Sequence, residues 1–143
     1  MVDVLWRPPP AGTVKVNIHG SVVGSPSAAS IGGVFRGLNA AFLGSFVQNI
    51  GIATAFTAEL TAAMYAIEKA FDENWHDLWL ESDSKQVILG LNGGTGVPWL
   101  LRNRWSNCMG KFRSLNGTCS HIFREGNSVA DALAKNALLF CLL

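Results

Sequence analysis

The chain has 143 residues and a formal net charge of +1; 49% of its residues are hydrophobic and 15% are charged. This composition excludes an intrinsically disordered chain, and the length predicts a single domain over residues 1–143, with 1–12 as a proline-rich lead-in. The three cysteines are widely spaced and form no C-x-x-C pair, so we interpret them as reduced thiols and exclude a disulfide framework and a cysteine-bound zinc.

Targeting segments are not expected. Residues 1–10 lack the apolar core of a signal peptide, and no window reaches the roughly 18 uninterrupted apolar residues that a membrane span needs. We therefore expect a protein of the nucleus or cytoplasm that is neither secreted nor membrane-bound.

The first half of the chain predicts a three-stranded antiparallel meander. From Val14 to His19 apolar and polar residues alternate, which predicts a half-buried strand with His19 on its polar face. Gly20 and the segment 24–27 mark a turn. Two further strands are expected over about 29–36 and 41–48.

After residue 48 the hydrophobic period changes from strand-like to helical. Leu60, Met64, Ile67 and Phe71 form one stripe of an amphipathic helix. In chain order we expect a helix over about 55–74, a strand over 78–81, a short helix opening at 83–86, a helix over about 98–115, a strand over 118–123 and a last helix from about Ser128. This order predicts one mixed sheet with helices packed on it.

Charged residues are segregated along the chain. Residues 59–83 contain seven acids and one base, whereas residues 84–124 contain six bases and no acid. Such segregation is typical of an anion-binding face beside an acidic pocket, and the alternative is chance clustering on a solvated surface.

Four residues are candidates for one site: His19, Glu59, Asp83 and Asp131. Each has a structural alternative when taken singly. Asp83 could cap the next helix, and Asp131 could complete a capping box that begins at Ser128. Glu59 could serve the dipole of the first helical turn, and His19 could be a polar-face strand residue.

Several short motifs occur in a fixed order over nearly the whole chain. They are Trp6 with the prolines 8–10, KVNIHG at 15–20, IGGVFR at 31–36, AEL at 58–60, ESDS at 81–84, REGNSVAD at 124–131 and LAK at 133–135. In these motifs the chain resembles the RNase H-like domains of plants, the reverse-transcriptase-like type found in retroelements and in many plant genes.

The resemblance implies an α/β, RNase H-like fold: a five-stranded mixed sheet, its first three strands antiparallel, with helices on both faces. It also implies cleavage of the RNA strand of an RNA–DNA hybrid by two Mg²⁺ ions about 4 Å apart, held by hard oxygen ligands. Glu59, Asp83 and Asp131 match three of the family's four metal-ligand positions, and thus its catalytic positions.

The fourth position is a departure, because His19 stands where the family carries the aspartate that bridges both ions. A neutral imidazole offers one lone pair and no charge, so it cannot bridge two hard cations. We therefore expect weak or absent Mg²⁺ binding, with Mn²⁺ as the alternative because it accepts nitrogen ligands more readily. Bacterial relatives also carry a mobile histidine in the last loop; the short loop 124–126 has none, and we interpret His121 as a structural strand residue.

Nucleic-acid contacts are expected from the basic stretch, through Arg102, Arg104, Lys111 and Arg113. The interleaved Trp99 and Trp105 could stack on bases, and the alternative is that they are buried beneath a basic edge.

Two function classes follow. The first is a catalytically impaired binding domain of the RNA–DNA hybrid ribonuclease lineage, a pseudoenzyme that binds a hybrid or another nucleic acid, or else a protein partner. The second is an active ribonuclease H that tolerates His19 and uses Mg²⁺ or Mn²⁺.

Overall fold

The computed structural model describes residues 6–94 and 96–128. In chain order the elements are β1 (Val14–Val23), β2 (Ala28–Arg36), the 3-10 turn η1 (Leu38–Ala40), β3 (Phe42–Ile52), α1 (Ala55–Asp72), β4 (Leu78–Ser82), α2 (Lys85–Leu91), η2 (Trp99–Leu101), α3 (Arg102–Ser114), β5 (Thr118–His121) and η3 (Arg124–Asn127). The predicted meander, first helix, fourth strand and fifth strand are all present.

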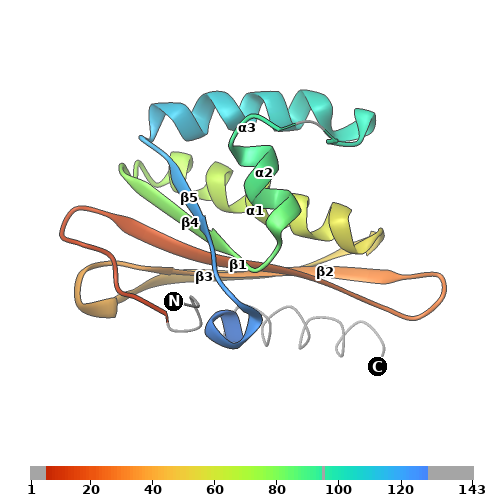
Figure 1. Cartoon of the computed structure of the whole chain (residues 1–143), viewed down its shortest axis with the longest axis horizontal. Helices are drawn as coiled ribbons and strands as arrows, with labels where there is room; N and C mark the ends of the chain where they lie inside the picture. Colours follow the sequence, from red (N-terminus) through yellow and green to blue (C-terminus); the bar gives the residue numbers. More distant parts are fainter. Residues whose placement is uncertain (1–5, 95, 129–143) are drawn as a thin grey trace.

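The strands form one mixed sheet in the order β3-β2-β1-β4-β5. β1 pairs antiparallel with β2, and β2 pairs antiparallel with β3, as predicted. β1 and β4 are parallel neighbours, as are β4 and β5, so the sheet changes from antiparallel to parallel pairing at β1. Figure 1 shows α1, α2 and α3 on one side of the sheet and η3, the short blue coil, on the other.

The main core lies between the sheet and α1. Val16 and Ile18 of β1 are fully buried there, against a helix face that includes Leu60, Met64 and Ile67. The predicted helical stripe therefore faces the sheet, except that Phe71 is 41% exposed at the end of α1. Full burial of each such aliphatic side chain contributes about 1.5–3 kcal/mol, so this layer fixes where α1 crosses β1.

The second face of β1 is also buried, which corrects the prediction of a half-buried strand. Lys15 is fully buried, and Asn17 and His19 are nearly so. The Lys15 ammonium lies 4.8 Å from the Trp6 ring centroid and 3.8 Å from that of Trp79. The proline-rich lead-in and β4 thus supply two indole rings that cover polar side chains, an arrangement that alternation within one strand cannot reveal.

Three local predictions differ from the structure. β1 continues through Gly20 to Val23, because Gly20 serves close packing and the turn lies at 24–27. Ser84, not Asp83, caps α2: its hydroxyl accepts a hydrogen bond from the Val87 amide at 3.4 Å. The helix expected from Pro98 begins as the 3-10 turn η2 and becomes α-helical only at Arg102.

The last helix predicted from about Ser128, with Asp131 in it, lies outside the described residues. Within residues 6–94 and 96–128, none of the helices has the length and apolar character needed to cross a membrane.

Candidate active site

Three of the four predicted site residues lie together beside the end of β4. His19 is on β1, Glu59 is on α1, and Asp83 directly follows β4. The parallel pairing of β1 and β4 sets Ile18 opposite Ser82. The residues that follow these two in the chain, His19 and Asp83, therefore lie side by side. Asp131 lies outside the described residues, and its participation stays a prediction.

One nitrogen of the histidine ring lies close to both carboxylates. His19 Nδ1 is 3.3 Å from Glu59 Oε1 and 3.4 Å from Asp83 Oδ1. The three side chains are only 7%, 12% and 10% exposed, respectively. One ligand atom from each residue lies within 4.8 Å of the other two, which makes the cluster compact enough for a metal ion.

Asp83 can take part in such a cluster because it does not cap α2. Ser84 supplies the cap of α2, and the Ser84 amide is itself bound by Ser82 Oγ at 3.0 Å. Asp83 Oδ2 is buried and accepts no hydrogen bond from any described residue. Glu59 is likewise beyond the first turn of α1, which begins at Ala55 and carries no acid there.

A cleft of about 410 Å³ opens over the cluster. Besides the three site residues it is lined by the exposed Lys85 and Arg124, and by His121. His121 ends β5, opposite Ser82 of β4, and its ring meets the Phe123 ring edge-on with 5.2 Å between centroids. Sequence reasoning missed that His121 and Lys85 line this cleft; the signal that could have found them is their position beside the end of β4.

Behind the site, a buried polar network fixes the strands that carry it. The Glu81 carboxylate accepts a hydrogen bond from Asn17 Nδ2 at 2.9 Å and lies 3.1 Å from the Lys15 ammonium. Burial lowers the pKa of Lys15, and the charge and hydrogen bond of Glu81 oppose this effect. β1 and β4 are therefore tied by charge-assisted contacts two residues before His19 and Asp83.

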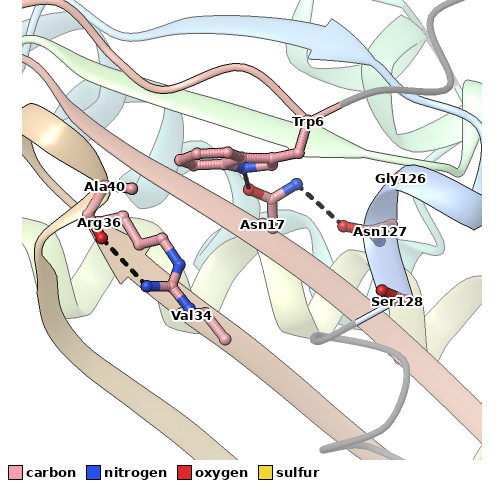
Figure 2. A pocket seen from close by; sticks show the side chains of 8 residues that line it. All are labelled: Trp6, Asn17, Val34, Arg36, Ala40, Gly126, Asn127 and Ser128. Carbon is pink, nitrogen blue, oxygen red and sulfur yellow. Dashed lines mark hydrogen bonds between the residues drawn. The ribbon is translucent and has the colours of Figure 1, made fainter.

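The same network reaches the chain that precedes Asp131. Asn17 accepts a hydrogen bond from the Trp6 indole nitrogen at 2.6 Å and donates one to Asn127 at 3.0 Å (Figure 2). Asn127 in turn donates to the Ile18 carbonyl at 2.7 Å. A pocket of about 330 Å³ lies beside these groups, and Arg36, which donates to the Ala40 carbonyl, forms part of its lining.

The four predicted nucleic-acid contacts fall into two groups. Arg102 and Arg113 are exposed. Arg104 instead makes a bidentate pair with Glu68 of α1, at 3.0 and 2.6 Å, and the Lys111 ammonium lies 5.1 Å from the Phe71 ring centroid. The hydrogen bonds from Arg104 lower the pKa of Glu68.

The two tryptophans are also distinct. Trp99, in η2, is 73% exposed. Trp105, on α3, is 8% exposed and packs into the hydrophobic core. The burial alternative therefore holds for Trp105, and stacking by Trp99 stays a prediction.

Comparison with known proteins identifies the class of this fold. Residues 17–137 match the reverse transcriptase-like family. The crystal structure of RNase H1 from the archaeon Halobacterium salinarum superposes with a TM-score of 0.79 at 28% identity, covering 90% of this chain and 98% of that one. The structure of LC11-RNase H1 in complex with an RNA/DNA hybrid gives a TM-score of 0.79 at 23% identity, covering 91% and 99%. The fold is thus that of ribonuclease H.

The chain belongs to the reverse transcriptase-like family of RNase H-like domains. It is 32% identical to ribonuclease HI of Halobacterium salinarum over 96% of this chain and 70% of that protein. It is 35% identical to an Arabidopsis thaliana protein named for ribonuclease H, over 92% of this chain. The chain spans about a fifth (22%) of the length of that Arabidopsis relative.

Proposed function

We propose that this chain is a nucleic-acid-binding domain of the RNA–DNA hybrid ribonuclease lineage in which Mg²⁺-dependent cleavage is impaired. The observation that carries the proposal is the imidazole of His19, whose Nδ1 lies 3.3 and 3.4 Å from the carboxylates of Glu59 and Asp83. By resemblance, this is the position of the carboxylate that two Mg²⁺ ions share.

The residues present do not fit a pair of Mg²⁺ ions. A shared ligand must offer lone pairs to both ions, and a carboxylate does so with two oxygens, whereas a neutral imidazole offers one nitrogen. Mg²⁺ also prefers oxygen ligands and loses its hydration water reluctantly. Replacement of a carboxylate by imidazole further removes one negative charge that two ions of total charge +4 require.

Nucleic-acid binding is supported by exposed cations at the cleft and on α3. Lys85 and Arg124 line it, and Arg102 and Arg113 are exposed on α3. Cations at such positions bind phosphates and give a binding affinity that falls with salt concentration. The exposed Trp99 adds an aromatic face of the kind on which unpaired bases stack. A solved relative, LC11-RNase H1, binds an RNA/DNA hybrid, which makes a hybrid the first ligand to test.

An active ribonuclease is the second candidate, and one observation favours it. Glu59 and Asp83, which by resemblance match the family's metal-ligand positions, line a cleft of about 410 Å³. In this case Mn²⁺ would support cleavage where Mg²⁺ does not, because Mn²⁺ tolerates the nitrogen of His19.

Binding and cleavage are tested on the same labelled RNA–DNA hybrid. We expect fluorescence anisotropy in EDTA to show binding that is tighter for the hybrid than for double-stranded DNA and that weakens with salt. In Mg²⁺ the RNA strand should stay intact. Rapid cleavage in Mg²⁺ would overturn the proposed impairment, and cleavage in Mn²⁺ alone would favour the second candidate. Absence of hybrid binding at low salt would favour a protein partner.

A further inference from the structure

We propose that His19, Glu59 and Asp83 form a binding site for a single borderline transition-metal ion of the Zn²⁺ type. The inference rests on the proposed function only in that it concerns the same cluster, which does not fit two Mg²⁺ ions. It assigns to that cluster a different ion, a different ion count and a different ligand set.

The two distances from His19 to the carboxylates match the ligand spacing around one tetrahedral ion. Around an ion with bonds of about 2.0–2.2 Å, two tetrahedral ligand atoms lie about 3.3–3.6 Å apart. His19 Nδ1 is 3.3 Å from Glu59 Oε1 and 3.4 Å from Asp83 Oδ1. One ligand atom from each of the three residues lies within 4.8 Å of the other two, so an ion placed among them would be close to all three.

The donor set favours a borderline ion over a hard one. One imidazole nitrogen and two carboxylate oxygens are typical ligands of Zn²⁺ and of neighbouring transition metals, whose affinities for such sites far exceed those of Mg²⁺. The described residues supply three of the four ligands of a tetrahedral ion, and the cleft lies over the cluster.

A second, independent observation points to a cation beside Asp83. The Asp83 side chain is 10% exposed, and its buried Oδ2 accepts no hydrogen bond from any described residue. A buried carboxylate oxygen without a donor is costly, and a cation bound beside it removes that cost. Neither the cap of α2 nor the network around Glu81 uses this oxygen.

The two cysteine thiols of the described chain are poorer candidates for the same ion. Burial raises the pKa of Cys108 to about 12 and raises that of Cys119, which disfavours the thiolate that binds metals. Among the described residues, the group of histidine, cysteine, aspartate and glutamate side chains close enough to share an ion is the one formed by His19, Glu59 and Asp83.

The test is ion binding by untagged protein that has been freed of metal with EDTA and desalted, without nucleic acid. Calorimetric titration with ZnCl₂ should give one site that binds at least about 100-fold more tightly than MgCl₂ does. Co²⁺ should give the intense visible absorption of a tetrahedral ion, without the near-ultraviolet band of sulfur ligation. Zn²⁺ should also raise the melting temperature.

Variants assign the site to these residues. His19→Asp should weaken Zn²⁺ binding at least about tenfold and strengthen Mg²⁺ binding, and Glu59→Gln should weaken Zn²⁺ binding without creating a Mg²⁺ site. Circular dichroism melting establishes that each variant is folded. The matched control is His76→Ala, which removes an exposed histidine outside the cluster and should leave Zn²⁺ binding unchanged.

Four outcomes would overturn the inference: no Zn²⁺ binding by folded wild type, a sulfur charge-transfer band with Co²⁺, Zn²⁺ binding unchanged in His19→Asp, or Zn²⁺ binding abolished in His76→Ala. These outcomes concern the ion alone. The proposed function is tested separately, by hybrid affinity in EDTA and by cleavage in Mg²⁺, so either idea can fail without the other.

Discussion

Gly20 of β1 lies directly against the backbone of Ala58 in α1, so closely that a Cβ at position 20 would overlap the Ala58 carbonyl carbon and the Glu59 amide nitrogen. Each of these residues neighbours a member of the cluster, because His19 precedes Gly20 and Glu59 follows Ala58. Because glycine has no Cβ at position 20, β1 and α1 can approach closely, and this close approach brings His19 and Glu59 together.

Substitution of this glycine should displace α1. We expect Gly20→Ala to lower the free energy of unfolding by about 1–3 kcal/mol, the range for overpacking of a tight contact, and to weaken ion binding by the cluster. Gly110→Ala is the control, since nothing lies within 4 Å of a Cβ there. This exposed helical position should instead gain about 0.5–1 kcal/mol. Urea denaturation measures both, and equal stability of Gly20→Ala and wild type would contradict the close contact.

The buried Lys15–Glu81 pair should be strongly coupled. Lys15→Met leaves the Glu81 carboxylate buried without its cation, which should cost about 3–5 kcal/mol of unfolding free energy. In the double variant Lys15→Met/Glu81→Gln, the neutral amide still accepts from Asn17, so much of the stability should return. A double-mutant cycle by urea denaturation tests this, and additive single effects would show that the two side chains act independently.

The exposed and paired arginines should differ in hybrid binding. Neutralisation of Arg102 and Arg113 to Gln should weaken hybrid binding and reduce the slope of log affinity against log salt by about 0.9 for each phosphate that the variant no longer neutralises. Arg104→Gln should change this slope less, because Glu68 already holds the Arg104 guanidinium. Anisotropy titrations over a series of salt concentrations measure the slopes. A larger effect of Arg104→Gln than of the exposed pair would place the phosphate-binding surface elsewhere.

The Arg104–Glu68 pair should also shape the acid side of the stability profile. Hydrogen bonds from Arg104 hold the pKa of Glu68 below its ordinary value of 4.5. A lowered folded-state pKa means that this stabilisation is present above pH 4.5 and is lost as the pH falls through the folded-state value. Glu68→Gln should therefore be less stable than wild type at pH 7. The difference in stability between the two proteins should shrink as the pH falls below 4.5. Melting temperatures between pH 3 and 7 measure this, and parallel profiles for the two proteins would contradict it.

Local sequence patterns predicted most of the fold. The alternation at 14–19 and the helical stripe from Leu60 to Ile67 depend on neighbours along the chain, so they are visible in the sequence. The sequence does not show which residue caps α2, because aspartate and serine are both good caps. The backbone conformation decides in favour of Ser84 over Asp83.

Contacts between distant segments set the limit of sequence reasoning. The burial of Lys15 depends on Trp6 and Trp79. The pairing of Arg104 depends on Glu68, which lies 36 residues earlier in the chain. The placement of His121 in the cleft depends on the parallel pairing of β4 and β5. None of these follows from the composition or period of one segment.

The central claim is that His19, in place of a shared carboxylate, impairs the Mg²⁺ chemistry of this domain. Its most direct test is single-turnover cleavage of a labelled RNA–DNA hybrid in Mg²⁺ by wild type and His19→Asp, with His19→Asp/Glu59→Gln as the control that should be inactive. We expect no cleavage by wild type and cleavage by His19→Asp, together with a melting temperature of His19→Asp that is lower without Mg²⁺ because carboxylates crowd. Wild type that cleaves in Mg²⁺ as fast as His19→Asp would contradict the claim.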